Sequence, residues 1–366
     1  MKQLSKKQPR SIAGSKPERI AGLDLGDRYS HYCVLTQDAE LVEEGRLQST
    51  EAGLRKQFAN EPRMRIALEA GTHSPWVSRL LEGCGHEVLV ANPRKIRAIT
   101  ASESKNDRND AEKLARFAAC DPKLLSPIRH RSPQRQQDLN LIHARSSLVR
   151  ARTGLVNALR GLVKSAGGRL GVCSTRSFPD KTRASIPPQL QPACAPLVEQ
   201  IAQLNLAIAG MDRQVEALGN KYPEIPLLRT VPGVGPIVAA CYVLTLDRPD
   251  IIQDNRQAGA FLGLRPRQSQ SGDKNPQHGI SKTGNTCLRS LLVQAAHYIL
   301  GRFGPDSALR RWGLGLAVRG GNRGKKRAVV AVARKLAVMM HSMWRNRRPF
   351  EPFPATAAPV QAAVAA

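Results

Sequence analysis

Four acidic residues in the first third of the chain stand at positions where a structural role is hard to assign. Asp24 interrupts the apolar run Ile-Ala-Gly-Leu-Asp-Leu-Gly, and Glu69 interrupts Ile-Ala-Leu-Glu-Ala-Gly. An ionised carboxylate in such a frame is costly unless it is paired or binds a metal. Asp107 and Asp110 are three residues apart, so a helix would present both on one face.

If these four carboxylates converge, cations must hold them together, because like charges repel. Hard ions such as Mg²⁺ prefer carboxylate oxygens. Two such ions about 4 Å apart stabilise the attacking and leaving oxygens of a phosphodiester displacement. We therefore expect two Mg²⁺ ions at Asp24, Glu69, Asp107 and Asp110. A structural role stays open for Asp107 or Asp110 taken singly, since either is equally typical of a helix N-cap.

A second group of candidate residues lies in the loop after Gly263, which is rich in Arg, Lys, Gly and Ser. Ser269, Ser271 and Ser281 are possible nucleophiles, because nearby cations and a polarised phosphate can activate a serine. On the sequence alone, a solvated basic loop is the favoured interpretation. The cations that we expect to contact DNA here are Arg265, Arg267, Lys274, Lys282 and Arg289.

Two further segments are typical of nucleic-acid contacts. The turn Val-Pro-Gly-Val-Gly-Pro, with Gly233 and Gly235, precedes an apolar helix, whose N-terminal N–H groups suit a phosphate. It resembles the hairpin of helix–hairpin–helix DNA binders, although a plain turn between helices stays possible. The stretch Arg319–Arg348 has ten Lys or Arg and no acid, and its apolar residues have helical spacing. We expect its cations, including Lys325, Lys326 and Arg327, to face nucleic acid, with a solvated face as the alternative.

The composition of the chain agrees with a polyanionic partner. Its 366 residues include 56 Lys or Arg against 29 Asp or Glu, a net charge of +27. Such a field attracts nucleic acid, since phosphate contacts release counterions. No run of about 18 apolar residues and no signal-peptide core is present, so we expect no membrane association. The seven cysteines are scattered, which favours a reduced cytoplasmic protein without zinc.

The elements that must position these residues fall into successive regions. Residues 1–18 read as a basic flexible arm. Three strands and then strand–helix alternation predict a mixed α/β sheet domain over residues 19–127. Two segments with heptad spacing predict a coiled-coil or helical-hairpin region over 128–222, interrupted by a loop or disordered connector at 165–195. A mostly helical region at 223–348 and a disordered tail at 349–366 complete the chain.

Five of these motifs, in this order, resemble those of the Piv/MooV-type invertases and the DEDD insertion-sequence transposases, some of which are guided by a bridge RNA. They are Gly-Leu-Asp-Leu-Gly, Leu-Glu-Ala-Gly, Lys-Asn-Asp-Arg-Asn-Asp-Ala, Val-Pro-Gly-Val-Gly-Pro, and Gln-Ser-Gly with Ile-Ser-Lys-Thr-Gly-Asn. The resemblance covers about residues 18–345. It implies a RuvC-like (RNase H-type) domain, coiled-coil helices and a C-terminal transposase domain.

The resemblance also implies catalytic roles. Asp24, Glu69, Asp107 and Asp110 match the acidic tetrad. Ser271 matches the serine that joins DNA covalently, with Ser269 as the near alternative and Ser281 less favoured. The implied activity is Mg²⁺-dependent exchange of DNA strands by a homodimer or tetramer, with a noncoding guide RNA, in the nucleoid of a prokaryote. The segment from Asp273 to His278 departs from the more basic pattern of relatives, which affects only the fine DNA or RNA contacts.

Two rival interpretations stay open at this stage. A junction resolvase with the same tetrad would hydrolyse DNA with water and need no serine. A non-catalytic nucleic-acid-binding scaffold would use the four acids as caps and ion-pair partners. The first predicts activity without Ser271, and the second predicts tight binding without Mg²⁺ and no strand cleavage.

Overall fold

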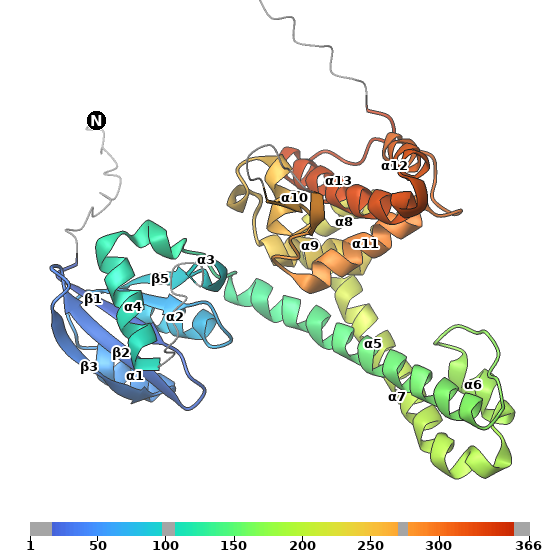
Figure 1. Ribbon diagram of the computed structural model, residues 1–366, viewed down its shortest axis with the longest axis horizontal. Helices are drawn as coiled ribbons and strands as arrows, with labels where there is room; N and C mark the ends of the chain where they lie inside the picture. The colour runs from blue at the N-terminus through green and yellow to red at the C-terminus, as the bar shows by residue number, and fades with distance from the viewer. Residues whose placement is uncertain (1–16, 97–106, 270–276, 355–366) are drawn as a thin grey trace, which may run out of the picture. The chain divides into compact units, whose positions relative to one another are not determined.

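The computed structural model describes residues 17–96, 107–269 and 277–354, and the chain divides into two units, Met1–His130 and Arg131–Ala366 (Figure 1). The expected arm at 1–18 therefore lies almost wholly outside the described residues. Within the described ranges, no helix combines the length and apolar character needed to cross a bilayer.

The first unit is built on a five-stranded mixed sheet in the order β3-β2-β1-β4-β5. Strands β1, β2 and β3 are antiparallel neighbours, whereas β4 is parallel to β1 and β5 is parallel to β4. Their bounds are Arg19–Asp24, Tyr29–Thr36, Leu41–Gln48, Arg65–Glu69 and Glu87–Ala91. The expected succession of three strands and then strand–helix alternation is present.

Helices cover both faces of this sheet. On one face, α1 (Glu51–Phe58) and α2 (Ser74–Gly83) pack on the alternating apolar residues of β1 and β4, such as Leu23 and Leu68. On the other face lies α4 (Asp107–Cys120). The short helices α3 (Pro93–Ile96) and η1 (Pro122–Leu125) complete the unit. A five-stranded mixed sheet flanked in this way is compatible with an RNase H-type domain.

The second unit begins with two long helices, α5 (Pro133–Ser165) and α7 (Gln191–Lys221), which form an antiparallel hairpin. Side-chain hydrogen bonds and ion pairs join residues in opposite order along the two helices: Asp138 with Lys221, Arg145 with Asp212, and Arg152 with Asn205. Of the two arrangements that the heptads allowed, this chain forms the hairpin within itself. Whether the helices also pair between chains stays a prediction.

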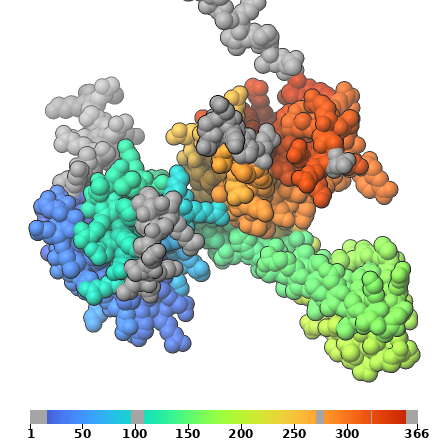
Figure 2. Space-filling view, viewed as in Figure 1, coloured from blue at the N-terminus to red at the C-terminus, as the bar shows by residue number. Residues whose placement is uncertain are grey.

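The expected loop at residues 165–195 is present only in its first part, because residues 166–177 form turns and irregular chain and helices begin at Phe178. The rest contains α6 (Phe178–Thr182) and the short helices η2 (Arg183–Ser185) and η3 (Pro188–Leu190), and α7 already begins at Gln191. Phe178 and Ile186 are buried against α5 and α7, so scattered apolar residues close the end of the hairpin despite the Gly and Pro content. The space-filling view shows this end as a compact lobe (Figure 2).

A helical body follows, built around the apolar helix α9 (Pro236–Leu246), whose residues from Val238 onward are all buried. Packed with it are α8 (Glu224–Arg229), α11 (Thr286–Leu300) and α13 (Gly324–Asn346). The remaining elements are η4 (Pro249–Ile251), η5 (Asn255–Gln257), α10 (Ala258–Phe261), β6 (Pro266–Gln268), β7 (Gln277–Ile280), α12 (Ala308–Arg319) and η6 (Gly321–Arg323).

The expected disordered tail is partly ordered. The Phe350 amide donates to the Thr230 hydroxyl at 3.0 Å, and the Ala308 amide donates to the carbonyl of Pro352 at 2.9 Å. The Arg311 guanidinium also stacks on Phe353, 4.9 Å from the ring centroid. These contacts hold residues 349–354 on the helical body, and the rest of the tail lies outside the described residues.

Candidate active site and nucleic-acid surface

The first two candidate carboxylates end neighbouring parallel strands. Asp24 is the last residue of β1 and Glu69 the last of β4, and each directly follows the registered pair Leu23–Leu68. Side chains alternate between the faces of a sheet, so both carboxylates point to the face opposite those leucines. Because neighbouring strands lie about 4.8 Å apart, both are within reach of one ion.

Helix α4 lies directly against this face. A Cβ on Gly22 would be 1.9 Å from the carbonyl oxygen of Ala111, so only glycine permits the approach. Ile20, earlier on the strand, shares a core with Leu114, later on the helix. The helix thus runs opposite to β1, and its first turn lies level with Asp24.

That first turn carries the other two candidates. Asp107 begins α4, and Asp110 is half-buried, with its Oδ1 3.4 Å from Nζ of Lys113. The backbone therefore brings all four positions to the carboxyl-terminal ends of β1 and β4. The Asp107 side chain lies outside the described residues. Among the side chains that are described, no three acids, histidines or cysteines lie close enough to hold a metal.

The donors at this edge fit a hard ion. Glu69 is half-buried, and within the described residues its carboxylate accepts no hydrogen bond and forms no ion pair. A carboxylate left in that condition is suited to a cation. The Cys33 thiol packs against the same helix, and burial raises its pKa. Metal coordination by the four acids remains a prediction.

The candidate serines belong to the β6–β7 hairpin and the loop after it. Ser269 follows β6 and is exposed, whereas Ser271 and Lys274 lie outside the described residues. Ser281 is half-buried, with its hydroxyl 3.0 Å from that of Thr283 and its amide donating to the carbonyl of Arg265. These contacts give Ser281 a structural role in its loop.

Arg289 holds this loop rather than facing solvent. It is only 9% exposed, and its guanidinium donates to the carbonyls of Leu262 and Thr283 and to the hydroxyl of Thr286. These contacts give Arg289 a positioning role in this loop, and its expected contact with DNA stays a prediction. The spacing of basic residues could not reveal this, because the burial depends on how α11 packs. Arg265, Arg267 and Lys282 are exposed, as a DNA contact requires.

The glycine-rich turn connects α8 to α9 as expected. Gly233 has φ +84°, and a Cβ there would lie 2.9 Å from Cδ1 of Tyr298. Gly235 is the N-cap of α9. The turn thus has a packing reason for Gly233, and its contact with a phosphate stays a prediction.

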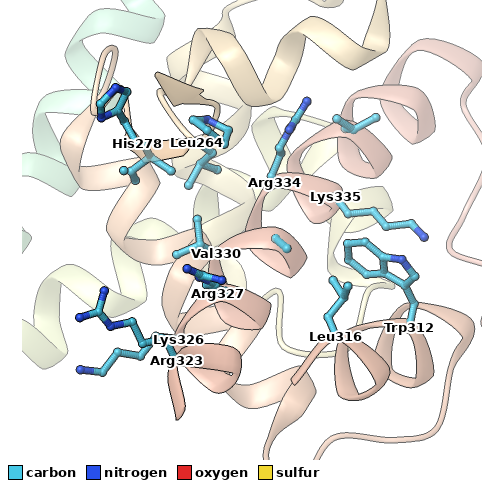
Figure 3. A pocket seen from close by; sticks show the side chains of 15 residues that line it. Leu264, His278, Trp312, Leu316, Arg323, Lys326, Arg327, Val330, Arg334 and Lys335 are labelled. Atoms are coloured by element: carbon cyan, nitrogen blue, oxygen red, sulfur yellow. The ribbon is translucent and has the colours of Figure 1, made fainter. Parts of the chain in front are cut away.

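The basic stretch forms η6 and α13. Lys325, Lys326 and Arg327 are exposed in the first turn of α13, while Val332 and Leu336 are buried in the core. Beside this helix lies a cavity that the sequence did not predict, bounded by the β6–β7 hairpin, α12 and α13 (Figure 3). The sequence indicates this cavity only weakly, because valines and basic residues alternate along one face of α13 at helical spacing.

Two family profiles match the chain. Residues 21–167 match one described as a transposase, and residues 225–312 match one described as the transposase IS116/IS110/IS902 family. The first range spans the four candidate acids, and the second spans the glycine-rich turn and the candidate serines.

Two relatives are similar over more than two thirds of their length, and a third over less than half of it. A probable family 20 transposase of Pseudomonas aeruginosa is 29% identical over 313 residues, covering 84% of this chain and 91% of the relative. The putative transposase y4pF/y4sB of Sinorhizobium fredii is 30% identical, covering 77% and 73%. The pilin gene-inverting protein of Moraxella lacunata is 29% identical over 150 residues, covering 40% and 45%.

Proposed function

The chain belongs to the IS116/IS110/IS902 family of insertion-sequence transposases and is a DNA recombinase; from that premise we propose that it exchanges DNA strands by Mg²⁺-dependent transesterification with Ser271 as the nucleophile. The observation that carries the proposal is the meeting of Asp24, Glu69 and the first turn of α4 at one edge of the sheet. A water-using resolvase shares that tetrad, so Ser271 distinguishes the two.

Domains of this family are generally metal-dependent. In the proposal, Asp24, Glu69, Asp107 and Asp110 hold two Mg²⁺ ions, which when bound polarise the scissile phosphate and neutralise developing charge. Strand pairing places the backbones of Asp24 and Glu69 side by side, and Gly22 lets the first turn of α4 approach them, which supports the proposed ligand set.

Ser271 supplies the covalent step. Its Oγ forms a bond to phosphorus while the bond from phosphorus to the leaving strand oxygen breaks, the serine proton is released, and the leaving oxygen gains a proton. A hydroxyl of the other DNA strand then attacks the same phosphorus and releases the serine. Each step exchanges one phosphodiester for another, so religation needs no ATP.

The partners proposed beyond DNA are a noncoding guide RNA and further copies of this chain. The net charge of +27 supports extensive phosphate contact. Strand exchange handles four DNA strands, which supports a homodimer or tetramer with tetrad and serine shared between copies. Mixing Asp24→Ala protein with Ser271→Ala protein tests the sharing: restored activity supports it, and no restoration counts against it.

The proposal is tested by trapping. The full-length protein is incubated with Mg²⁺, labelled DNA spanning the element junction, and the adjacent noncoding RNA, and then denatured. We expect label on the protein that disappears in both Ser271→Ala and Asp24→Ala, with Ser269→Ala as the matched control that keeps it. Cleavage without an adduct that survives Ser271→Ala would make the protein a nuclease and overturn the mechanism.

A further inference from the structure

A cavity in the second unit lies between the β6–β7 hairpin, α12 and α13 (Figure 3). Its volume is about 900 Å³, within the range of roughly 300–1,000 Å³ that is common for ligand pockets. The candidate serines 269 and 271 lie between the two strands that form one wall. The cavity is thus lined by the two strands that flank the proposed nucleophile in the sequence.

The inner surface of the cavity is apolar. Leu264 and Ile280 from the hairpin and Leu316 from α12 face Val330 and Val338 of α13. Leu264 belongs to the buried core of the helical body, and the half-buried Ile280, Val330 and Val338 pack against that core. An apolar surface of this size suits a flat, weakly polar group such as a nucleobase.

The rim of the cavity is strongly basic. Among the described residues that line it, five carry Lys or Arg side chains and none is acidic: Arg323, Lys326, Arg327, Arg334 and Lys335. Within the described part of the chain, none of the five forms an ion pair with a carboxylate. Cations gathered without counter-charge repel one another, and a bound polyanion relieves that repulsion. A neutral ligand would leave it in place.

An aromatic ring completes the cavity. Trp312 of α12 is half-buried in the lining, and Nζ of Lys335 lies 4.4 Å from its ring centroid. Aromatic rings and nearby cations are the groups on which single-stranded nucleic acids stack their bases. A base inside the cavity would contact the apolar inner surface, and the phosphates next to it would contact the basic rim.

We propose that this cavity binds an unstacked nucleotide of single-stranded DNA, with the base against the apolar wall and Trp312 and the flanking phosphates at Arg327 and Arg334. The inference deepens the proposed function and rests on it, because strand exchange at the hairpin requires locally unpaired DNA. The cavity would hold such a strand against β6 and β7.

The test compares two single strands that have the same number of phosphates. Affinities of the full-length protein for a labelled oligothymidylate and for an abasic oligonucleotide of equal length are measured by fluorescence anisotropy at one fixed salt concentration. Stacking of one base predicts roughly tenfold tighter binding of the oligothymidylate. Equal affinities for the two strands would overturn the proposal.

Variants then locate the effect in the cavity. Ala331→Trp fills the space without entering the core and should abolish the preference, whereas Ala331→Ser leaves the cavity open and should keep it. Arg334→Gln should weaken binding of both strands and lower the salt dependence by about one phosphate contact. Arg302→Gln removes the same charge away from the cavity and should do neither. Circular dichroism and thermal melting verify that each variant is folded.

Two further outcomes are decisive. Tighter binding of oligouridylate than of oligothymidylate, lost in Ala331→Trp, would overturn the assignment to DNA in favour of RNA. The covalent adduct is assayed separately with the wild-type protein. A covalent adduct without any base preference would refute only the proposed nucleotide binding by the cavity. A base preference without an adduct would refute only the proposed serine chemistry.

Discussion

Replacing Gly22 by alanine should separate the two halves of the acidic site. The added Cβ would lie 1.9 Å from the carbonyl oxygen of Ala111, whereas ordinary contact begins at 3.4 Å, so α4 must retreat by about 1.5 Å. Displacing reacting groups by about 1 Å costs on the order of 100-fold in rate. We therefore expect Gly22→Ala to lower strand exchange at least 100-fold and to raise the Mg²⁺ concentration needed for half-maximal activity.

The same change should reduce stability moderately, because overpacking typically costs about 1–3 kcal/mol. Activity is measured well below the melting temperature, so that unfolding does not contribute. Gly83→Ala is the matched control: this exposed glycine ends α2, nothing lies within 4 Å of its added Cβ, and activity should be unchanged. Wild-type exchange by Gly22→Ala would refute the placement of α4 against β1 as the basis of the site.

Three other changes give distinct outcomes. Glu69→Gln should abolish exchange yet leave the melting temperature unchanged or higher without metal, because the half-buried carboxylate has no partner in the described chain; marked destabilisation would indicate a structural acid. Arg289→Ala should cost about 2–3 kcal/mol in urea unfolding, since it donates to the carbonyls of Leu262 and Thr283, and an unchanged midpoint would contradict that role. Burial alone would raise the pKa of Asp138, but hydrogen bonds from Lys221 and Tyr222 outweigh it and lower the pKa. Its stabilising effect is therefore present above the unfolded pKa and lost as pH falls, so Asp138→Asn should destabilise at pH 7 and converge on the wild type in acid; a constant difference would oppose this.

The sheet unit could be predicted from the sequence almost element by element. Short apolar runs and turn signals define β1 and β4 locally, and Asp24 and Glu69 stood out because each interrupts such a run. The meeting of these acids with α4 was not predictable from patterns. It depends on strand order and on the contact at Gly22, which are set by tertiary packing.

The second unit shows where local signals fail. Gly and Pro content suggested a loop at 165–195, yet Phe178 and Ile186 bury themselves against the long helices. Arg289 looked like a DNA contact because nothing in its neighbours indicates burial. The basic cavity escaped notice for a related reason: Trp312 and Arg334 are far apart in the sequence and meet only when α12 packs on α13.

Peptide mapping can show whether the serine between β6 and β7 in the sequence becomes joined to DNA, as we propose. Trypsin cleaves after Arg267 and Lys274 and releases a short peptide that contains Ser269 and Ser271. After trapping with Mg²⁺ and nuclease trimming, fragmentation of this peptide in a mass spectrometer should place the nucleotide on Ser271. An adduct on any other residue, or strand exchange with this peptide unmodified throughout, would contradict the account.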